Sequence, residues 1–225
     1  GTIEIEVIGN KNLGYPFPAI LCYYRSKDYI SVVHSAGRIL NSNEDHQTNT
    51  WRESNFLSIY DDNLSPFISI FNGQDAMNTE LSIKFLKLPV KDLILEKKFP
   101  LELNPFGSKI FYANEFLDDS EKKLLKGKRF FIEFEHENKG IFGRYVVGNY
   151  LKKANMHFCT HSFMSVTESG DIIESSKENP VTSFLPAFNK KPLNLKLISY
   201  PTNIKSNVTF KSKEANIDEI IEQDT

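Results

Sequence analysis

Short runs in which polar and apolar residues alternate recur along this chain, and they constrain its fold more than any other feature. Such runs occur at 2–8 ("TIEIEVI"), 50–60 ("TWRESNFLSIY") and 193–200 ("LNLKLISY"), and "RFFIEFEHE" at 129–137 has the same character. A period of two residues puts successive side chains on opposite faces of a strand, so each run predicts a strand with one buried face.

Further strands are predicted between these runs, with one helix. The strands are expected at 19–24, 29–34, 67–71, 81–88 and 93–103. Residues 113–128 ("ANEFLDDSEKKLLKGK") carry a partial apolar stripe and end near Gly127, which favours a helix with a glycine stop. The first 137 residues therefore predict an all-β fold, an antiparallel β-sandwich of about eight strands with a short helical insertion.

The pattern loosens after residue 137. Segments 140–151 and 156–168 resemble strands, a polar loop follows, and the final residues suggest a short acidic helix or a frayed tail. We expect a domain boundary here, with a β-sandwich at 1–137 and a β-rich extension or second small unit at 138–225.

Composition and charge narrow the class of protein. The net charge is −2, which gives no global attraction to nucleic acid or to an anionic membrane, so any such attraction must be local. Cys22 and Cys159 lie far apart, which favours a reducing, cytoplasmic location. No apolar run approaches the roughly 20 residues of a membrane span. The expected location is cytoplasmic, with peripheral attachment to a membrane left open.

Four segments together resemble the C2 domain family. They are "GTIEIEVIGNKNLG" (1–14), "TNTWRESNF" (48–56), "SPFISIFNGQDAMNTE" (65–80) and "KGKRFFIEFEH" (126–136), in the order in which C2 domains carry an opening strand, a Trp-containing strand, a calcium loop and a closing strand. The resemblance covers about three fifths of the chain. It implies an eight-stranded sandwich that binds phospholipid or protein in vesicle trafficking, secretion or scaffolding.

The calcium ligands of C2 domains are missing from the matching positions. Family members draw aspartates from two loops, but the first loop here, at 9–19, has no carboxylate. In the second loop Asn72 and Gln74 occupy the positions nearest the Asp-x-Asp pattern, and only Asp75 and Glu80 are acidic. Calcium affinity rises with the number of converging carboxylates, so the sequence predicts calcium independence.

Two sets of residues are candidates for binding without calcium. Tyr15 and Phe17 lie near prolines in the first loop and could insert into a bilayer or a partner pocket, or fold back onto the sandwich. C2 domains often carry a basic strand face, where each cation near an anionic membrane contributes roughly 1 kcal/mol. The alternative is a solvated face. The candidate basic set, with a neighbouring tyrosine, is Tyr23, Arg25, Lys27, Lys84, Lys87 and Lys91.

The sequence does not argue for an enzyme. No nucleophile elbow, phosphate-binding loop or dinucleotide fingerprint occurs, and no aromatic–basic signature suggests nucleic acid as a partner. His157, Cys159 and His161 would share one strand face, a spacing that can present ligands to zinc. We therefore predict a non-catalytic module without cofactor or metal that binds an anionic membrane or a protein. The alternatives are a purely protein-binding scaffold and a zinc-containing enzyme.

Composition adds a second similarity. The abundance of Asn, Lys, Ile and Phe suggests an AT-rich genome. Together with the calcium-less C2 pattern, this is similar to the apicomplexan rhoptry apical surface proteins, which pair C2-like and lipid-binding modules at a secretory organelle. That similarity rests on composition and not on matched residues.

Overall fold

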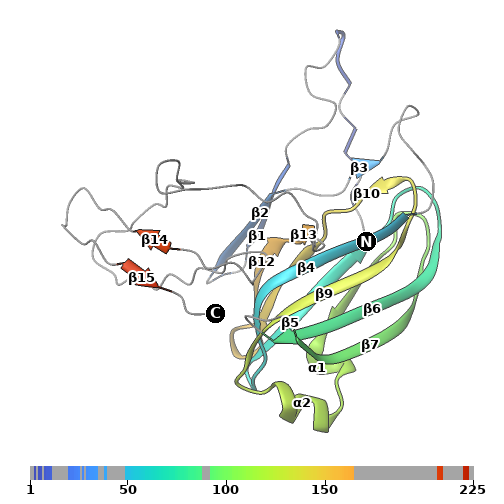
Figure 1. Ribbon diagram of the computed structural model, residues 1–225. Coiled ribbons are helices and arrows are strands. Elements are labelled where there is room, and N and C mark those ends of the chain that lie inside the picture. The colour runs from blue at the N-terminus through green and yellow to red at the C-terminus, as the bar shows by residue number, and fades with distance from the viewer. Residues whose placement is uncertain are drawn as a thin grey trace, which may run out of the picture. The chain divides into compact units, whose positions relative to one another are not determined.

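A computed structural model describes residues 3, 5–6, 8–11, 20–25, 27, 29–34, 38–39, 49–87, 92–164, 207–209 and 220–222. Over these residues the chain forms antiparallel strands and two short α-helices, which confirms the all-β prediction (Figure 1). No helix within the described ranges has the length and apolar character needed to cross a membrane.

The strands up to Phe163–Met164 belong to one compact unit, and the helices lie between the eighth and ninth strands. In chain order the elements are β1 (Leu21–Arg25), β2 (Ile30–His34), β3 (Arg38–Ile39), β4 (Asn49–Ile59), β5 (Leu64–Phe71), β6 (Met77–Lys87), β7 (Asp92–Leu103), β8 (Ser108–Tyr112), α1 (Ala113–Phe116), α2 (Asp119–Leu125), β9 (Arg129–Asn138), β10 (Ile141–Phe142), β11 (Val146–Leu151), the 3-10 turn η1 (Lys152–Ala154), β12 (Met156–His161) and β13 (Phe163–Met164).

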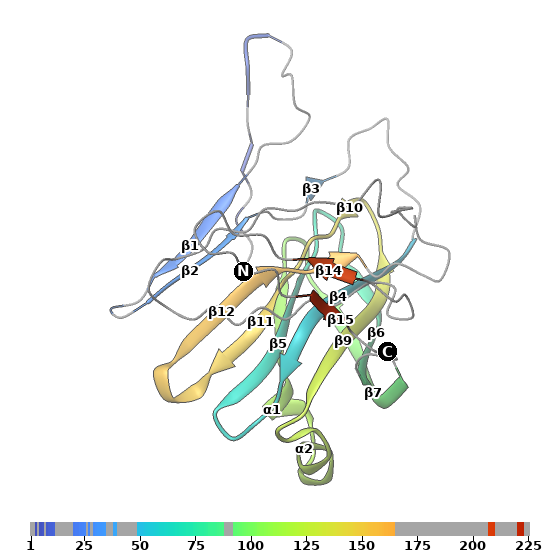
Figure 2. The same ribbon diagram turned by 60° about the vertical axis from the view of Figure 1, so that its left-hand side comes forward.

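Two sheets face each other in a sandwich-like arrangement. One has the strand order β13-β4-β9-β6-β7 and the other β12-β11-β5-β8 (Figure 2). Their inner faces share one apolar core, because Ile68, Ile70 and Val147 from the second sheet pack in the same cluster as Leu81 and Phe134 from the first. Strands with one apolar face reach low free energy only when that face is covered, and each sheet covers the other.

The predicted helix at 113–128 is two short helices. Asp118 has an extended backbone, so the first helix ends before it. Its carboxylate then accepts hydrogen bonds from the amides of Ser120 and Glu121, and the Glu121 side chain accepts from the Asp118 amide at 2.9 Å. This capping box starts α2 afresh, because it satisfies amides that have no partner inside the helix.

The compact units divide after Ser165, not near residue 137 as the sequence suggested. β11 pairs with β5 and β13 pairs with β4, so residues 146–164 complete the sheets of the first unit. The second unit, 166–225, contains the antiparallel pair β14 (Asn207–Thr209) and β15 (Ile220–Glu222). Ile220–Glu222 is thus a strand rather than the helical tail that we considered.

Two further differences concern single elements. β8 (Ser108–Tyr112) was not predicted, because "SKIFY" is short and follows directly on a turn. The predicted strand at 2–8 is described only at residues 3, 5, 6 and 8, and these positions are not in a strand. The rest of that segment, and the predicted strand at 193–200, lie outside the described residues.

Candidate functional site

The β1–β2 hairpin exposes an apolar face. Its register places Tyr23 opposite Val32, and the pairs at either end are Leu21 with His34 and Arg25 with Ile30. Residues directly opposite each other share a face. The exposed fractions of the large side chains on this face are 58% for Leu21, 66% for Tyr23, 61% for Ile30 and 46% for Val32. On the other face Val33 is buried but Tyr24 is 44% exposed, so that face is covered only in part, and the face of Leu21, Tyr23, Ile30 and Val32 is the more open of the two.

Cations lie at the turn end of the same hairpin. Arg25 is exposed and belongs to the open face, where it pairs with Ile30. Lys27 is exposed in the connection between the strands. Its neighbour Asp28 lies outside the described residues. The open face therefore combines four large apolar groups with adjacent positive charge. We call Leu21, Tyr23, Arg25, Ile30 and Val32 the hairpin docking face.

Side-chain contacts hold the hairpin against the edge of the four-stranded sheet. The Tyr29 hydroxyl donates to the Asn155 carbonyl oxygen at 2.8 Å, and the Cys159 amide donates to Ser31 Oγ at 3.0 Å. At the other end, the rings of His34 and His161 meet edge to face with centroids 4.5 Å apart. These contacts fix the hairpin to β12. Because His34 is opposite Leu21, its contact with His161 lies at the Leu21 end of the docking face, and the large apolar side chains of that face remain exposed.

The structure separates the basic residues that the sequence grouped together. Arg25 and Lys27 belong to the hairpin, whereas Lys84 and Lys87 lie on β6 in the five-stranded sheet. Tyr15, Phe17 and Lys91 lie outside the described residues.

The neighbours of the β6 lysines are acidic. Lys84 stands directly between Glu96 on β7 and Glu133 on β9, and Lys87 is opposite Asp92. Carboxylates on either side compensate the charge of Lys84, so its surroundings are not a basic patch.

The outer faces of the two sheets differ sharply in charge. On the five-stranded sheet, Arg52 Nε donates to Glu135 at 2.6 Å and Lys98 pairs with Glu80 at 3.0 Å. The register places no Asp, Glu, Lys or Arg on the outer face of the four-stranded sheet over its described strands. The residues there are Ser65, Phe67, Ser69, Phe71, Ser108, Ile110, Tyr112, Val146, Gly148, Tyr150, His157, Cys159 and His161.

The candidate zinc ligands His157, Cys159 and His161 lie on that uncharged face, but the two histidines form hydrogen bonds with other groups of the protein. His157 Nε2 is hydrogen-bonded to the Tyr112 hydroxyl at 2.9 Å, and its ring stacks on Tyr150 with centroids 4.6 Å apart. His161 Nδ1 donates to the Ser162 carbonyl oxygen at 2.7 Å. Burial lowers the pKa of His157 and raises that of the Cys159 thiol. Within the described ranges, no three His, Cys, Asp or Glu side chains gather in a group that could hold a metal ion.

The β5–β6 loop, which the sequence analysis compared with a C2 calcium loop, is held in place by the side-chain amide of Asn72. Asn72 is buried, and its Nδ2 donates to the Asp75 carbonyl oxygen at 2.7 Å and to the Leu103 carbonyl oxygen at 3.3 Å. The Phe106 amide donates to the Gly73 carbonyl oxygen at 2.7 Å. Asn72 therefore joins the β5–β6 loop to the end of β7, which is a structural role.

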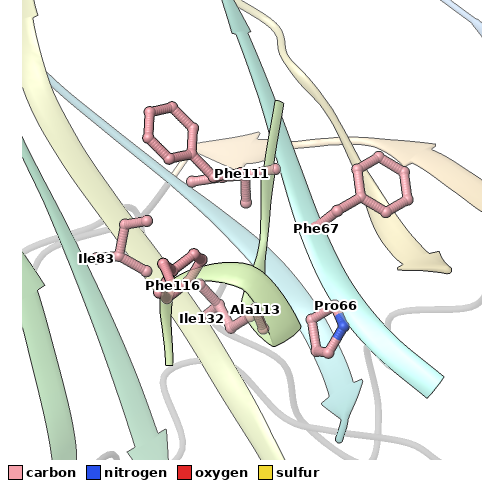
Figure 3. Close-up of a pocket in the computed structure, with 8 residues that line it drawn as sticks. Pro66, Phe67, Ile83, Phe111, Ala113, Phe116 and Ile132 are labelled. Atoms are coloured by element: carbon pink, nitrogen blue, oxygen red, sulfur yellow. The ribbon is translucent and has the colours of Figure 1, made fainter. Parts of the chain in front are cut away.

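A small pocket between the sheets, beside α1, has only apolar side chains around it (Figure 3). Ile83, Phe111, Phe116 and Ile132 are among them. Its volume is about 10 Å³, the space of about one water molecule. Such a void is a packing defect and cannot accommodate an organic substrate or an acyl chain.

From the sequence, Tyr23, Arg25 and Lys27 were named as candidates, but Leu21, Ile30 and Val32 beside them were not. A signal was present, because "LCYY" and "ISVV" are apolar on both strand faces, which a half-buried hairpin does not need.

Comparisons with protein families, with curated proteins and with solved structures found no match to this chain.

Proposed function

We propose that this chain is a non-catalytic, calcium-independent module that binds anionic membrane surfaces through the hairpin docking face. The observation that carries the proposal is the open apolar face of the β1–β2 hairpin beside Arg25 and Lys27. A surface with large apolar groups and adjacent cations matches the membrane interface, where acyl chains and anionic headgroups lie side by side. The resemblance to C2 domains supports the same role.

The expected contributions to the binding free energy fit a reversible attachment to the membrane. Complete burial of a large apolar side chain contributes about 1.5–3 kcal/mol, and partial insertion of Leu21, Tyr23, Ile30 and Val32 contributes a fraction of that for each. Each cation adds about 1 kcal/mol near an anionic surface. The sum is comparable to the binding of a single myristoyl chain, which alone gives marginal and reversible attachment. Binding is therefore expected to depend on both anionic lipid and the apolar face.

Vesicle co-sedimentation tests the proposal. The wild-type chain should bind phosphatidylcholine vesicles that contain phosphatidylserine, equally with calcium and with a chelator, and should bind pure phosphatidylcholine weakly. Val32→Glu should reduce this binding about tenfold or more, because it puts a carboxylate against anionic headgroups. Leu124→Glu on α2 is the matched control, since Leu124 is exposed to a similar extent, 41%.

Three results would overturn the proposal. One is binding that requires calcium, and another is equal binding by Val32→Glu and the wild type. Wild-type protein that binds neither kind of vesicle also overturns it, and would leave a protein-binding scaffold as the function to examine.

A further inference from the structure

One hydrogen bond joins the turn end of the hairpin to the turn between β11 and β12. The Tyr29 hydroxyl donates to the Asn155 carbonyl oxygen at 2.8 Å, across 126 residues of sequence. Tyr29 directly precedes β2, so it lies beside Lys27 and the Arg25–Ile30 pair. Asn155 directly follows the 3-10 turn that carries Lys152 and Lys153. Two cationic turns from distant parts of the chain are thus placed together.

The β11–β12 turn is a fixed platform. The Lys152 amide donates to the Asn63 carbonyl oxygen at 2.8 Å, and the Lys153 amide donates to Asn63 Oδ1 at 2.9 Å. Asn155 has a left-handed backbone, with φ 48°, and its Oδ1 accepts from the Tyr150 hydroxyl at 3.0 Å. Because these bonds hold the backbone, the lysines project from a defined position.

The two lysines of this turn differ in availability. Lys152 Nζ donates to the Asp62 carbonyl oxygen at 3.3 Å and lies over the Tyr60 ring. Lys153 is exposed. The nearby Asp62 carboxylate is hydrogen-bonded to Lys126 at 2.6 Å, its main cationic partner, while the charges of Lys152 and Lys153 have smaller effects on it. Lys153 is therefore the cation of this turn that can reach a ligand.

We propose that the hairpin turn and the β11–β12 turn are two halves of one clamp, in which Lys27 from one turn and Lys153 from the other hold the phosphate of a lipid headgroup. The inference rests on the proposed membrane binding and specifies where the headgroup binds. A lipid fits better than a soluble phosphate ester, because the hairpin docking face beside the clamp gives apolar contacts that only a bilayer can use.

A double-mutant cycle tests the clamp on vesicles that contain phosphatidylserine. Lys27→Gln and Lys153→Gln should each weaken binding about fivefold. If both lysines contact one phosphate, the double variant should lose clearly less than the product of the two single losses, because the second substitution removes an interaction already broken. Lys139→Gln is the matched control, since Lys139 is an exposed lysine in the turn after β9.

Tyr29→Phe gives a test that changes no charge. Removing the hydroxyl releases the bond between the two turns, so the coupling between Lys27 and Lys153 should disappear in the Tyr29→Phe background. Glycerophosphoserine, the soluble headgroup, should not displace the protein from vesicles, because it cannot engage the apolar face.

The outcomes separate the clamp from the proposed function. Strictly multiplicative losses for Lys27 and Lys153, or unchanged coupling in Tyr29→Phe, would overturn the clamp while membrane binding stands. Displacement by glycerophosphoserine would overturn the assignment to a lipid. If wild-type protein fails to bind anionic vesicles at all, the proposed function fails, and the clamp fails with it.

Discussion

The Trp51 indole nitrogen donates a hydrogen bond to Glu53 Oε1 at 3.0 Å, and this places a carboxyl group inside the sandwich-like fold. Glu53 is only 3% exposed. Burial raises its pKa above the ordinary value, and this outweighs the opposite effects of hydrogen bonds from Ser162 and Trp51 and of the Arg144 charge. The folded chain therefore favours the protonated form of Glu53 more than the unfolded chain does.

The first prediction concerns the pH dependence that Glu53 creates. Because its pKa is raised in the folded state, its contribution to stability is fully present below about pH 4.5, its ordinary pKa, and is lost as the pH rises through the folded value. Glu53→Gln removes this titration and can still accept a hydrogen bond from Trp51. The variant should therefore gain stability relative to wild type as the pH rises.

Urea unfolding measured across pH, with the fluorescence of the chain's one tryptophan as the probe, checks this. Glu102→Gln, on the outer face, is the control and should follow the wild-type curve. Parallel curves for Glu53→Gln and wild type would contradict the prediction.

A second prediction concerns the amide in the loop after β5. Asn72→Ala leaves the carbonyl oxygens of Asp75 and of buried Leu103 without this donor and should lower the free energy of unfolding by about 1–3 kcal/mol. Asn72→Asp introduces the residue type of a calcium loop, but it turns a carboxylate toward two carbonyl oxygens and should cost more. Denaturant midpoints measure both variants.

Calcium should not shift the midpoint of Asn72→Asp, because a single added carboxylate does not supply the six to eight oxygen ligands of a calcium site. Gln74→Asp changes the same loop at an exposed position and should remain within about 0.5 kcal/mol of wild type. A calcium-dependent rise in the stability of Asn72→Asp would contradict this prediction.

Alternation in the sequence predicts on which face of a strand a residue lies, but not which strand pairs with that strand. The run at 129–137 became β9, and its glutamates face outward as the period of two requires. The pairing of β11 with β5 could not be predicted, because no local pattern in residues 146–151 indicates that their partner strand lies about 80 residues earlier. That pairing is also why the expected boundary near residue 137 and the division after Ser165 differ.

The same limit applied to the candidate site. Arg25 and Lys84 each stand in a predicted strand, and only the sheet order shows that those strands belong to different sheets. The open face of the hairpin was equally hidden, because exposure depends on which tertiary neighbour covers a strand. Local pattern therefore located the cations of the hairpin but not the apolar side chains beside them.

The third prediction concerns the close approach of β11 and β12. A Cβ on Gly148 would lie 1.8 Å from the Phe158 carbonyl oxygen, a backbone atom that cannot move without shifting β12. Gly148→Ala should therefore cost about 3 kcal/mol or more. Gly127→Ala is the comparison, since its Cβ would meet nothing but its φ of 72° is unfavourable, at a cost of about 1 kcal/mol. Equal losses in thermal or denaturant unfolding would contradict this account.

The last prediction tests which surface binds the membrane, the hairpin docking face or the outer face of the five-stranded sheet. Lys84 stands between Glu96 and Glu133, so an anionic bilayer would meet carboxylates on either side of it. Lys84→Glu should leave vesicle binding unchanged and reduce stability by about 0.5–1 kcal/mol, because it places three carboxylates in a row across neighbouring strands. Arg25→Glu should show the reverse, with a loss of vesicle binding and little change in unfolding, because Arg25 is exposed on the hairpin docking face. If Lys84→Glu abolishes binding and Arg25→Glu does not, the membrane meets the β6 face that the sequence first suggested.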